Sequence, residues 1–189
     1  MFKVLPLMKK HGKGIILNIA SRSGSLDLPG TLSYSVSKTA VIRAVGCIQL
    51  ELDMDGLGDD IQIYALHPGG VLTDMPQSIF SPYMCANCLA PMAADVVAAY
   101  PQRAAALKEW LPLFKTSRFL CGATMVYIAS GKAKVLKGRY FDCEQDIEQV
   151  VAAGPSEIID KDLYRLQIPF LGGLANDGGI AKDMKVAPH

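Results

Sequence analysis

The 189-residue sequence lacks three features that each point to a particular class of protein. No apolar run reaches the about 18 residues that a membrane-spanning helix needs, so we expect no membrane partner. Its 19 basic and 18 acidic residues nearly balance and form no basic cluster, which gives no reason to expect nucleic acid as a partner. Its five cysteines are odd in number and irregularly spaced. This usage fits a reducing compartment, and with no secretory signal among the first residues we expect a cytoplasmic location.

Residues with the spacing of metal ligands are also scarce. Cys85 and Cys88 stand three apart, but a structural zinc site needs four ligands and no second Cys/His pair accompanies them. Packing is favoured over a metal or redox role for these thiols. His67 precedes a Pro-Gly turn and has no carboxylate partner in register, so a packed or hydrogen-bonded histidine is favoured over a ligand or base. The sequence therefore predicts no metal site.

What the sequence does contain is a pair of residues suited to proton transfer. Tyr34 and Lys38 are four residues apart, a spacing that places both side chains on one face of a helix. A positive charge close to a phenol favours the phenolate and lowers its pKa, so such a pair can give or take a proton near neutral pH. The simpler interpretation is a surface helix on which the two residues are neighbours by chance.

Two predicted strands bring further polar residues toward this pair. Gly14–Ile19 is a short apolar run rich in β-branched residues, which predicts a buried strand, and Ser21 follows it 13 residues before Tyr34. The alternating stretch Ile61–Leu66 predicts a second strand, and a Pro-Gly-Gly turn follows it. A strand end, a loop and a helix can deliver a serine hydroxyl and a tyrosine to one place.

Together these features resemble the short-chain dehydrogenase/reductase family. The matching residues are Asn18-Ile19-Ala20-Ser21, Tyr34-Ser35-Val36-Ser37-Lys38 and Pro68-Gly69-x-Val71-x-Thr73. A softer match, Gly138-Arg139-Tyr140 followed by an acidic stretch, resembles the ending of some filamentous-fungal members. The resemblance implies an α/β, Rossmann-like fold with a doubly wound parallel sheet.

The resemblance also implies a role for each matching residue. Ser21 would hydrogen-bond the substrate oxygen, Tyr34 would donate or accept the proton, and Lys38 would lower the tyrosine pKa and bind the nicotinamide ribose. The turn after the second strand would contact the nicotinamide carboxamide. The residues implied in cofactor binding are thus Tyr34, Lys38, Pro68, Gly69, Val71 and Thr73.

A glycine-rich turn for the pyrophosphate of a dinucleotide is missing. No Gly-x-x-x-Gly-x-Gly or Gly-x-Gly-x-x-Gly opens a helix in this sequence, although backbone N–H groups need such a turn to approach a pyrophosphate closely. We therefore expect a truncated fold that lacks the family's N-terminal dinucleotide-binding half. NAD(P) is the cofactor that the resemblance implies, but its binding by this chain alone at micromolar concentration is not expected. The choice between NAD and NADP would be set in the missing half.

The chain divides into two expected regions. Residues 1–143 would form the later part of the Rossmann-like domain, and residues 144–189 a helical and flexible tail. Within the first region we expect helices at 1–11, 32–54 and 118–130, a last strand at 138–143, and a proline-rich substrate lid at about 75–114. The apolar side chains of that lid either bind a bulky, weakly polar substrate or simply pack over the sheet. The helix at 32–54 would bury Val41, Val45, Ile48 and Leu52.

Three functions remain open from the sequence. The first is an NAD(P)-dependent oxidoreductase acting on a small apolar carbonyl or secondary alcohol, incomplete as given. The second is a cofactor-independent acid/base enzyme, an isomerase or cyclase, that uses Ser21, Tyr34 and Lys38. The third is a non-catalytic partner of a full-length relative through helices 1–11 and 32–54, which would also serve a homo-oligomer. The first is favoured, because a catalytic triplet beside a nicotinamide-side turn is hard to explain otherwise.

Overall fold

A computed structural model of the chain describes residues 3–28, 31–72, 112 and 114–168. Its helices and strands, in chain order, are α1 (Leu5–His11), β1 (Gly14–Ile19), the 3₁₀ turn η1 (Arg22–Gly24), α2 (Leu32–Met54), β2 (Ile61–His67), α6 (Arg118–Ala129), the 3₁₀ turn η3 (Lys134–Leu136), β3 (Tyr140–Asp142) and α7 (Ile147–Ile158). The expected helices and strands at these places are confirmed. The lid expected at about 75–114 falls almost wholly outside the described residues, as do Cys85 and Cys88.

The three strands form one parallel sheet in the order β1-β2-β3. Gly14 pairs with Ile61 and Ile19 with Leu66, and at the other side of β2 His67 pairs with Asp142. In a parallel sheet all carboxyl ends lie at the same edge. The segments that follow β1, β2 and β3 therefore emerge side by side.

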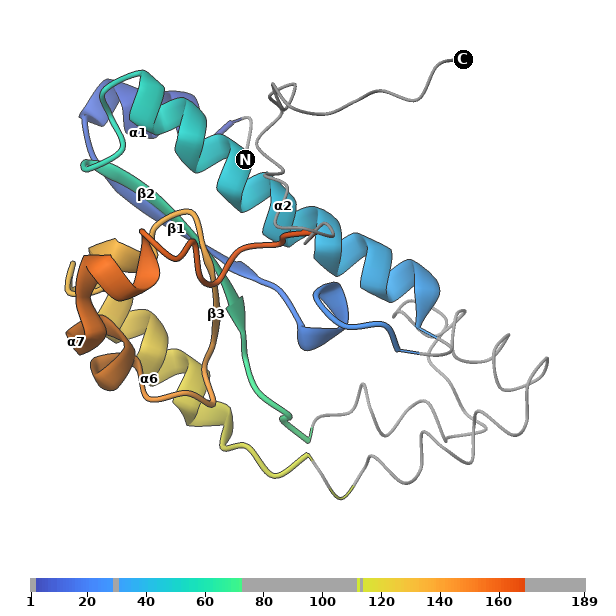
Figure 1. Cartoon of the computed structure of the whole chain (residues 1–189). Helices are drawn as coiled ribbons and strands as arrows, with labels where there is room; N and C mark the ends of the chain where they lie inside the picture. The colour runs from blue at the N-terminus through green and yellow to red at the C-terminus, as the bar shows by residue number, and fades with distance from the viewer. Residues whose placement is uncertain (1–2, 29–30, 73–111, 113, 169–189) are drawn as a thin grey trace, which may run out of the picture.

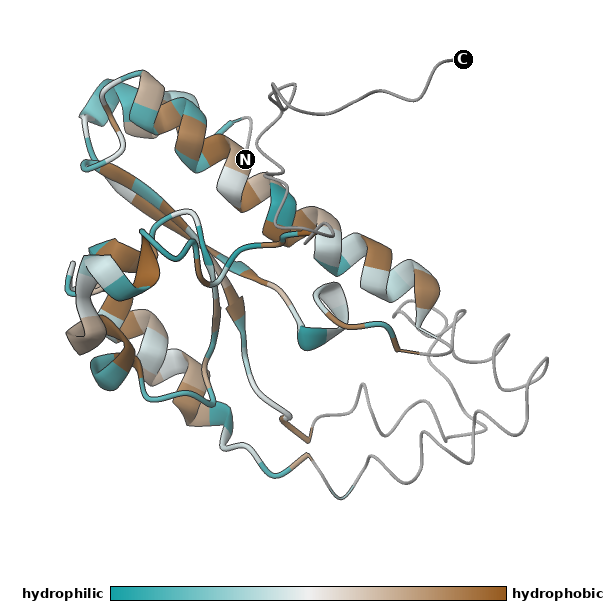
Figure 2. Ribbon diagram, viewed as in Figure 1, coloured by the Kyte–Doolittle hydropathy of each residue, from teal (hydrophilic) through white to brown (hydrophobic). Residues whose placement is uncertain are grey.

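Helices cover both faces of this sheet (Figure 1), with α1 and α2 on one side and α6 and α7 on the other. All seven residues of β2 are buried. Ile61, Ile63 and Ala65 pack against the α2 side, whereas Tyr64 and Leu66 pack against the α6 and α7 side. Figure 2 shows hydrophobic residues along the strands and recurring along α2. A parallel strand with both faces covered is typical of a Rossmann-like α/β fold, so the expected fold class is confirmed.

The buried stripe of α2 differs in part from the stripe expected from the sequence. Val45 and Leu52 are buried as predicted, but Val41 and Ile48 are only partly buried beside them. The centre of the helix face is completed by Ile42 and Gln49, which are 4% and 3% exposed. The shift has a physical reason: the buried glutamine satisfies backbone groups at the start of β2. Its side-chain oxygen accepts from the Ile63 N–H at 2.9 Å, and its nitrogen donates to the Gly58 carbonyl at 3.2 Å.

The outer edge of β3 is covered by the segment that follows α7. The Tyr140 N–H donates to the Tyr164 carbonyl at 2.8 Å, and the Arg139 guanidinium pairs with Asp162 at 3.1 Å. Ile158 of α7 is buried in the same core as Phe141 of β3.

Within the described segments, no helix combines the length and the apolarity needed to cross a bilayer.

The opposite edge of the sheet, along β1, is less protected. Among the described residues β1 pairs with β2 alone, its residues are only partly buried, and Ile19 is 42% exposed. An apolar, β-branched strand with unpaired N–H and C=O groups is a template for pairing with another chain.

The buried glutamine of α2 gives a first testable prediction. Replacing Gln49 with Leu should lower the free energy of unfolding by about 1–3 kcal/mol, because the buried Ile63 N–H loses its acceptor. Chemical denaturation followed by circular dichroism measures this change. Glu51→Leu places the same side chain on the exposed face of α2 and should shift stability by less than about 0.5 kcal/mol. Equal effects in the two variants would contradict the role given to Gln49.

The open edge of β1 gives a second prediction. We expect the 189-residue chain to self-associate through β1, and Ile19→Lys to reduce this association because a charge opposes strand pairing. Sedimentation at several protein concentrations measures it. Leu50→Lys adds the same charge on the exposed face of α2, where Leu50 is 56% exposed. If only Leu50→Lys dissociates the chain, the association runs through the helices and not through β1.

Candidate active site

Ser21 lies directly beyond the carboxyl end of β1, in a loop pressed against α2. Its side chain caps η1 by accepting from the Ser23 N–H at 3.2 Å, and the residue is only 8% exposed. Gly24 makes the close approach possible, because a Cβ there would lie 2.7 Å from the backbone carbon of Lys38. The Thr39 hydroxyl donates to the Gly24 carbonyl at 2.9 Å and closes the contact.

Tyr34 and Lys38 lie on one face of α2, as the four-residue spacing predicts. The Lys38 ammonium is 5.5 Å from the centre of the Tyr34 ring. It also donates to the backbone carbonyl of Ile19 at 2.9 Å, two residues before Ser21. Lys38 therefore joins the first turns of α2 to the end of β1, and both side chains are half-buried. The pair sits at the same edge of the sheet as the serine.

The turn after β2 begins beside this loop. The Ala20 N–H donates to the Leu66 carbonyl at 2.7 Å, which extends the β1–β2 ladder up to the residue before Ser21. Pro68 and Gly69 follow at the same level, and Gly69 has a φ of +90°. A Cβ at Gly69 would lie 2.5 Å from Cγ2 of Thr116, so both the backbone angle and the space require glycine.

Of the seven residues singled out in the sequence, the structure describes six at one edge of the sheet: Ser21, Tyr34, Lys38, Pro68, Gly69 and Val71. Thr73 lies outside the described residues. Carboxyl ends of parallel strands are the usual binding edge of α/β sheets. A carbonyl or alcohol oxygen held there would have a hydroxyl donor, a phenol and an ammonium within one loop and one helix face.

Sequence reasoning missed a charged cluster at this edge, which we call the Arg22 network: Arg22, Asp142 and Glu144. The Arg22 Nε donates to Asp142 at 2.5 Å, and its Nη2 donates to Glu144. The hydrogen bond with Asp142 raises the pKa of the arginine above its ordinary value. The contacts join residues about 120 positions apart, and only the strand order brings them together.

The expectation that His67 has no carboxylate partner in register was wrong. Asp142 is its paired residue on β3, and its charge acts on the imidazole. The pairing of β2 with β3 spans 75 residues and could not be predicted from the sequence around His67. The histidine is packed, as expected, at 8% exposure, and its burial lowers the pKa of the imidazole. Among the described residues, its Nδ1 atom finds no hydrogen-bond partner.

His67, Asp142 and Glu144 present ligand atoms within 4.8 Å of one another, a set that could hold a divalent cation. The guanidinium of Arg22 already bridges the two carboxylates, however. Both oxygens of Glu144 accept hydrogen bonds, one from Arg22 and the other from Gly70 and Thr116. We therefore assign the cluster to an ion-pair network whose cation is Arg22.

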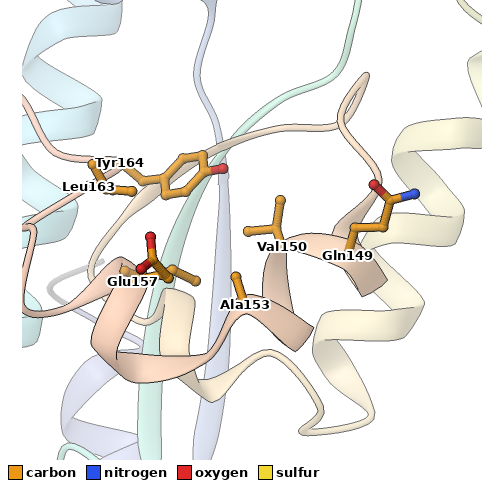
Figure 3. Close-up of a pocket in the computed structure, with 7 residues that line it drawn as sticks. Gln149, Val150, Ala153, Glu157, Leu163 and Tyr164 are labelled. Atoms are coloured by element: carbon orange, nitrogen blue, oxygen red, sulfur yellow. The ribbon is translucent and has the colours of Figure 1, made fainter.

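A small cavity lies in the other layer of the molecule (Figure 3). It has a volume of about 250 Å³ and is lined by Gln149, Val150, Ala153, Glu157, Ile158, Leu163 and Tyr164. Its lining comes from α7 and the segment that follows, on the side of the sheet opposite α2. None of the candidate site residues lines it. The cavity and the candidate active site therefore lie in different parts of the fold.

Comparison with known proteins gives matches along most of the chain. The family model for short chain dehydrogenases matches residues 1–83, a range that includes every candidate site residue. The short chain dehydrogenase mpl6 of Monascus purpureus is 25% identical over 87% of this chain and 46% of its own length. The 2-(R)-hydroxypropyl-CoM dehydrogenase of Xanthobacter autotrophicus is 30% identical over 72% of this chain and 49% of its own length.

A second fungal relative, the short chain dehydrogenase tazN of Aspergillus terreus, is 26% identical over 89% of this chain and 32% of its own length. The chain thus spans about half the length of the first two of these relatives and a third of the last. Residues 1–83 thus match the short-chain dehydrogenase family, and the parallel α/β sheet and the relatives that match most of the chain agree with this match.

Proposed function

We propose that this chain carries the catalytic part of an NAD(P)-dependent oxidoreductase that interconverts a carbonyl and a secondary alcohol. The observation that carries the proposal is the position of the Tyr34/Lys38 pair at the end of β1, where Lys38 donates to the Ile19 carbonyl at 2.9 Å, two residues before Ser21. The relative from Xanthobacter autotrophicus is named for a 2-(R)-hydroxypropyl compound, a secondary alcohol, which supports the substrate class.

In this mechanism Ser21 and Tyr34 act on the substrate oxygen, and Lys38 acts on Tyr34. The Ser21 hydroxyl donates a hydrogen bond to that oxygen and fixes its position. The Tyr34 hydroxyl gives the oxygen a proton in the reductive direction and takes it back in the oxidative direction. Lys38 holds a positive charge beside the phenol and offers donors to a ribose. A nicotinamide held beside Lys38 and the turn after β2 would supply or accept the hydride.

The described residues fit the nicotinamide end of such a cofactor. The close packing of Gly69 on Thr116 holds the turn after β2 at the carboxyl edge of the sheet, where the Val71 N–H donates within the turn to the Gly69 carbonyl at 3.0 Å and leaves the Val71 carbonyl for a ligand. For the pyrophosphate end the chain offers no glycine-rich strand-to-helix turn. We therefore propose that productive binding needs contacts beyond those that these residues supply. NAD and NADP are both compatible with the nicotinamide end.

In addition to the edge pairing expected through β1, we propose a second contact between copies of this chain, a homo-oligomer through α1 and α2. Both helices expose large apolar side chains, with Leu7 at 58%, Leu50 at 56% and Met54 at 80% exposure. The Leu50→Lys variant described above tests this surface directly.

We also propose that the substrate is a small apolar carbonyl or alcohol and that the protein is located in the cytoplasm.

Removal of the Tyr34 hydroxyl tests the proposed function. In a form of the protein that turns over a secondary alcohol, Tyr34→Phe should lower kcat by roughly 10²–10⁴-fold, because it deletes the proton-transferring group and almost no packing volume. The change is measured by absorbance of the reduced nicotinamide, with circular dichroism as a check on folding. Tyr127→Phe, on α6 in the other layer, is the matched control and should retain activity. Retention of most activity in Tyr34→Phe would refute the assignment.

A further inference from the structure

Glu144 lies two residues beyond the end of β3 and uses both of its carboxylate oxygens. Its Oε1 atom accepts from the Gly70 N–H at 3.0 Å and from the Thr116 hydroxyl. Its Oε2 atom accepts from the Arg22 guanidinium. The side chain is 28% exposed, so the carboxylate is partly shielded from water. Three donors converge on one residue that the sequence reasoning did not single out.

These donors come from three separate segments around the candidate active site. Arg22 directly follows Ser21 in the loop after β1. Gly70 belongs to the turn after β2, next to Val71. Thr116 precedes α6, and its N–H donates to the Gly70 carbonyl at 2.9 Å. Gly70 and Thr116 thus face each other at the two ends of the stretch 71–115, and one carboxylate oxygen binds both.

We propose that Glu144 is a positioning residue. It binds Gly70 in the turn after β2 and Thr116 before α6, and it links both to Arg22 in the loop that carries Ser21, which we call the serine loop. Its consequence for catalysis rests on the function proposed above, whereas its structural part does not. Asp142 supports the same arginine from β3, at 2.5 Å from Nε. The turn that would face the nicotinamide is then held in place before the coenzyme binds, so that less of the binding free energy is spent on ordering it.

The charge of Glu144 strengthens this arrangement over the whole physiological range. The Thr116 hydroxyl, the Gly70 N–H and Arg22 lower the pKa of Glu144 from 4.5 to about 2. Because the folded pKa lies below the ordinary value, the stabilisation is fully present above pH 4.5 and is lost as the pH falls toward 2. The charged and titratable groups that face it are Arg22, Asp142 and His67, and the buried His67 gains its proton only below its ordinary pKa.

Hydrogen exchange of the Gly70 amide tests the inference on the complete 189-residue chain. Glu144→Gln keeps the size of the side chain but removes its charge and turns a donor toward Arg22. The Gly70 amide should then exchange about tenfold faster or more, since its charged acceptor becomes a neutral amide oxygen and the link from that side chain to Arg22 is broken. Glu157→Gln, which affects one exposed ion pair with Lys161, is the matched control and should leave Gly70 unchanged. Unchanged Gly70 exchange in Glu144→Gln would overturn the proposal.

A second measurement needs no variant, in case Glu144→Gln does not fold. In the wild-type chain the Gly70 amide proton resonance should titrate with a midpoint well below pH 4.5, following Glu144. A midpoint at or above pH 4.5 contradicts the arrangement.

Kinetics separate this inference from the proposed function. In a turnover-competent form, Glu144→Gln should raise the KM for the nicotinamide coenzyme several-fold more than it lowers kcat, whereas a general loss of structure would lower the active fraction and hence kcat. If Tyr34→Phe leaves turnover intact while Gly70 loses protection in Glu144→Gln, the proposed function fails and the positioning of the turn stands. If Tyr34→Phe is inactive while Glu144→Gln changes neither exchange nor KM, the inference about Glu144 fails alone.

Discussion

The parallel pairing of β1 with β2 is the constraint on which the candidate active site depends. Ile19 pairs with Leu66, and the ladder continues through Ala20, so Ser21 and the Pro68-Gly69 turn leave the sheet together. Complete burial of β2 fixes this register, because a slip by one residue would turn its apolar side chains from one helix layer to the other. Any change that weakens this pairing moves the serine and the turn apart.

The sheet brings the segments that follow its strands close together, and two charged side chains, Lys38 and Glu144, then hold those segments in place. Lys38 joins α2 to the Ile19 carbonyl, and Glu144 joins the turn after β2 to Arg22 in the serine loop. Both contacts use a charged group, and hydrogen bonds to charged groups are stronger than neutral ones. Loops that would otherwise move independently are thereby tied to the ends of the strands.

Local pattern was enough to predict most of the helices and strands, whereas the fold class and the roles of the candidate site residues came from the family resemblance. The β-branched run of β1 and the four-residue spacing of Tyr34 and Lys38 depend only on neighbouring residues, and the structure contains the strand and the paired side chains. The expected burial of β1 was wrong among the described residues, because only β2 pairs with it. Contacts between distant segments could not be predicted this way. Glu144 meets Arg22 across 122 positions, and Gln49 replaces an apolar residue in a core stripe because the start of β2 needs a hydrogen-bond acceptor.

In the proposed function, a nicotinamide group binds between the loop that carries Ser21, the first turns of α2 and the turn after β2. Titration of the isotope-labelled chain with nicotinamide mononucleotide at millimolar concentration, followed by amide resonances, tests it most directly. We expect shifts confined to residues around Ser21, Tyr34, Lys38 and Val71, with the resonances of the α7 cavity lining unchanged. Resonance shifts at the α7 cavity would contradict this binding site. So would a titration curve that saturates while the resonances of those four residues stay unchanged.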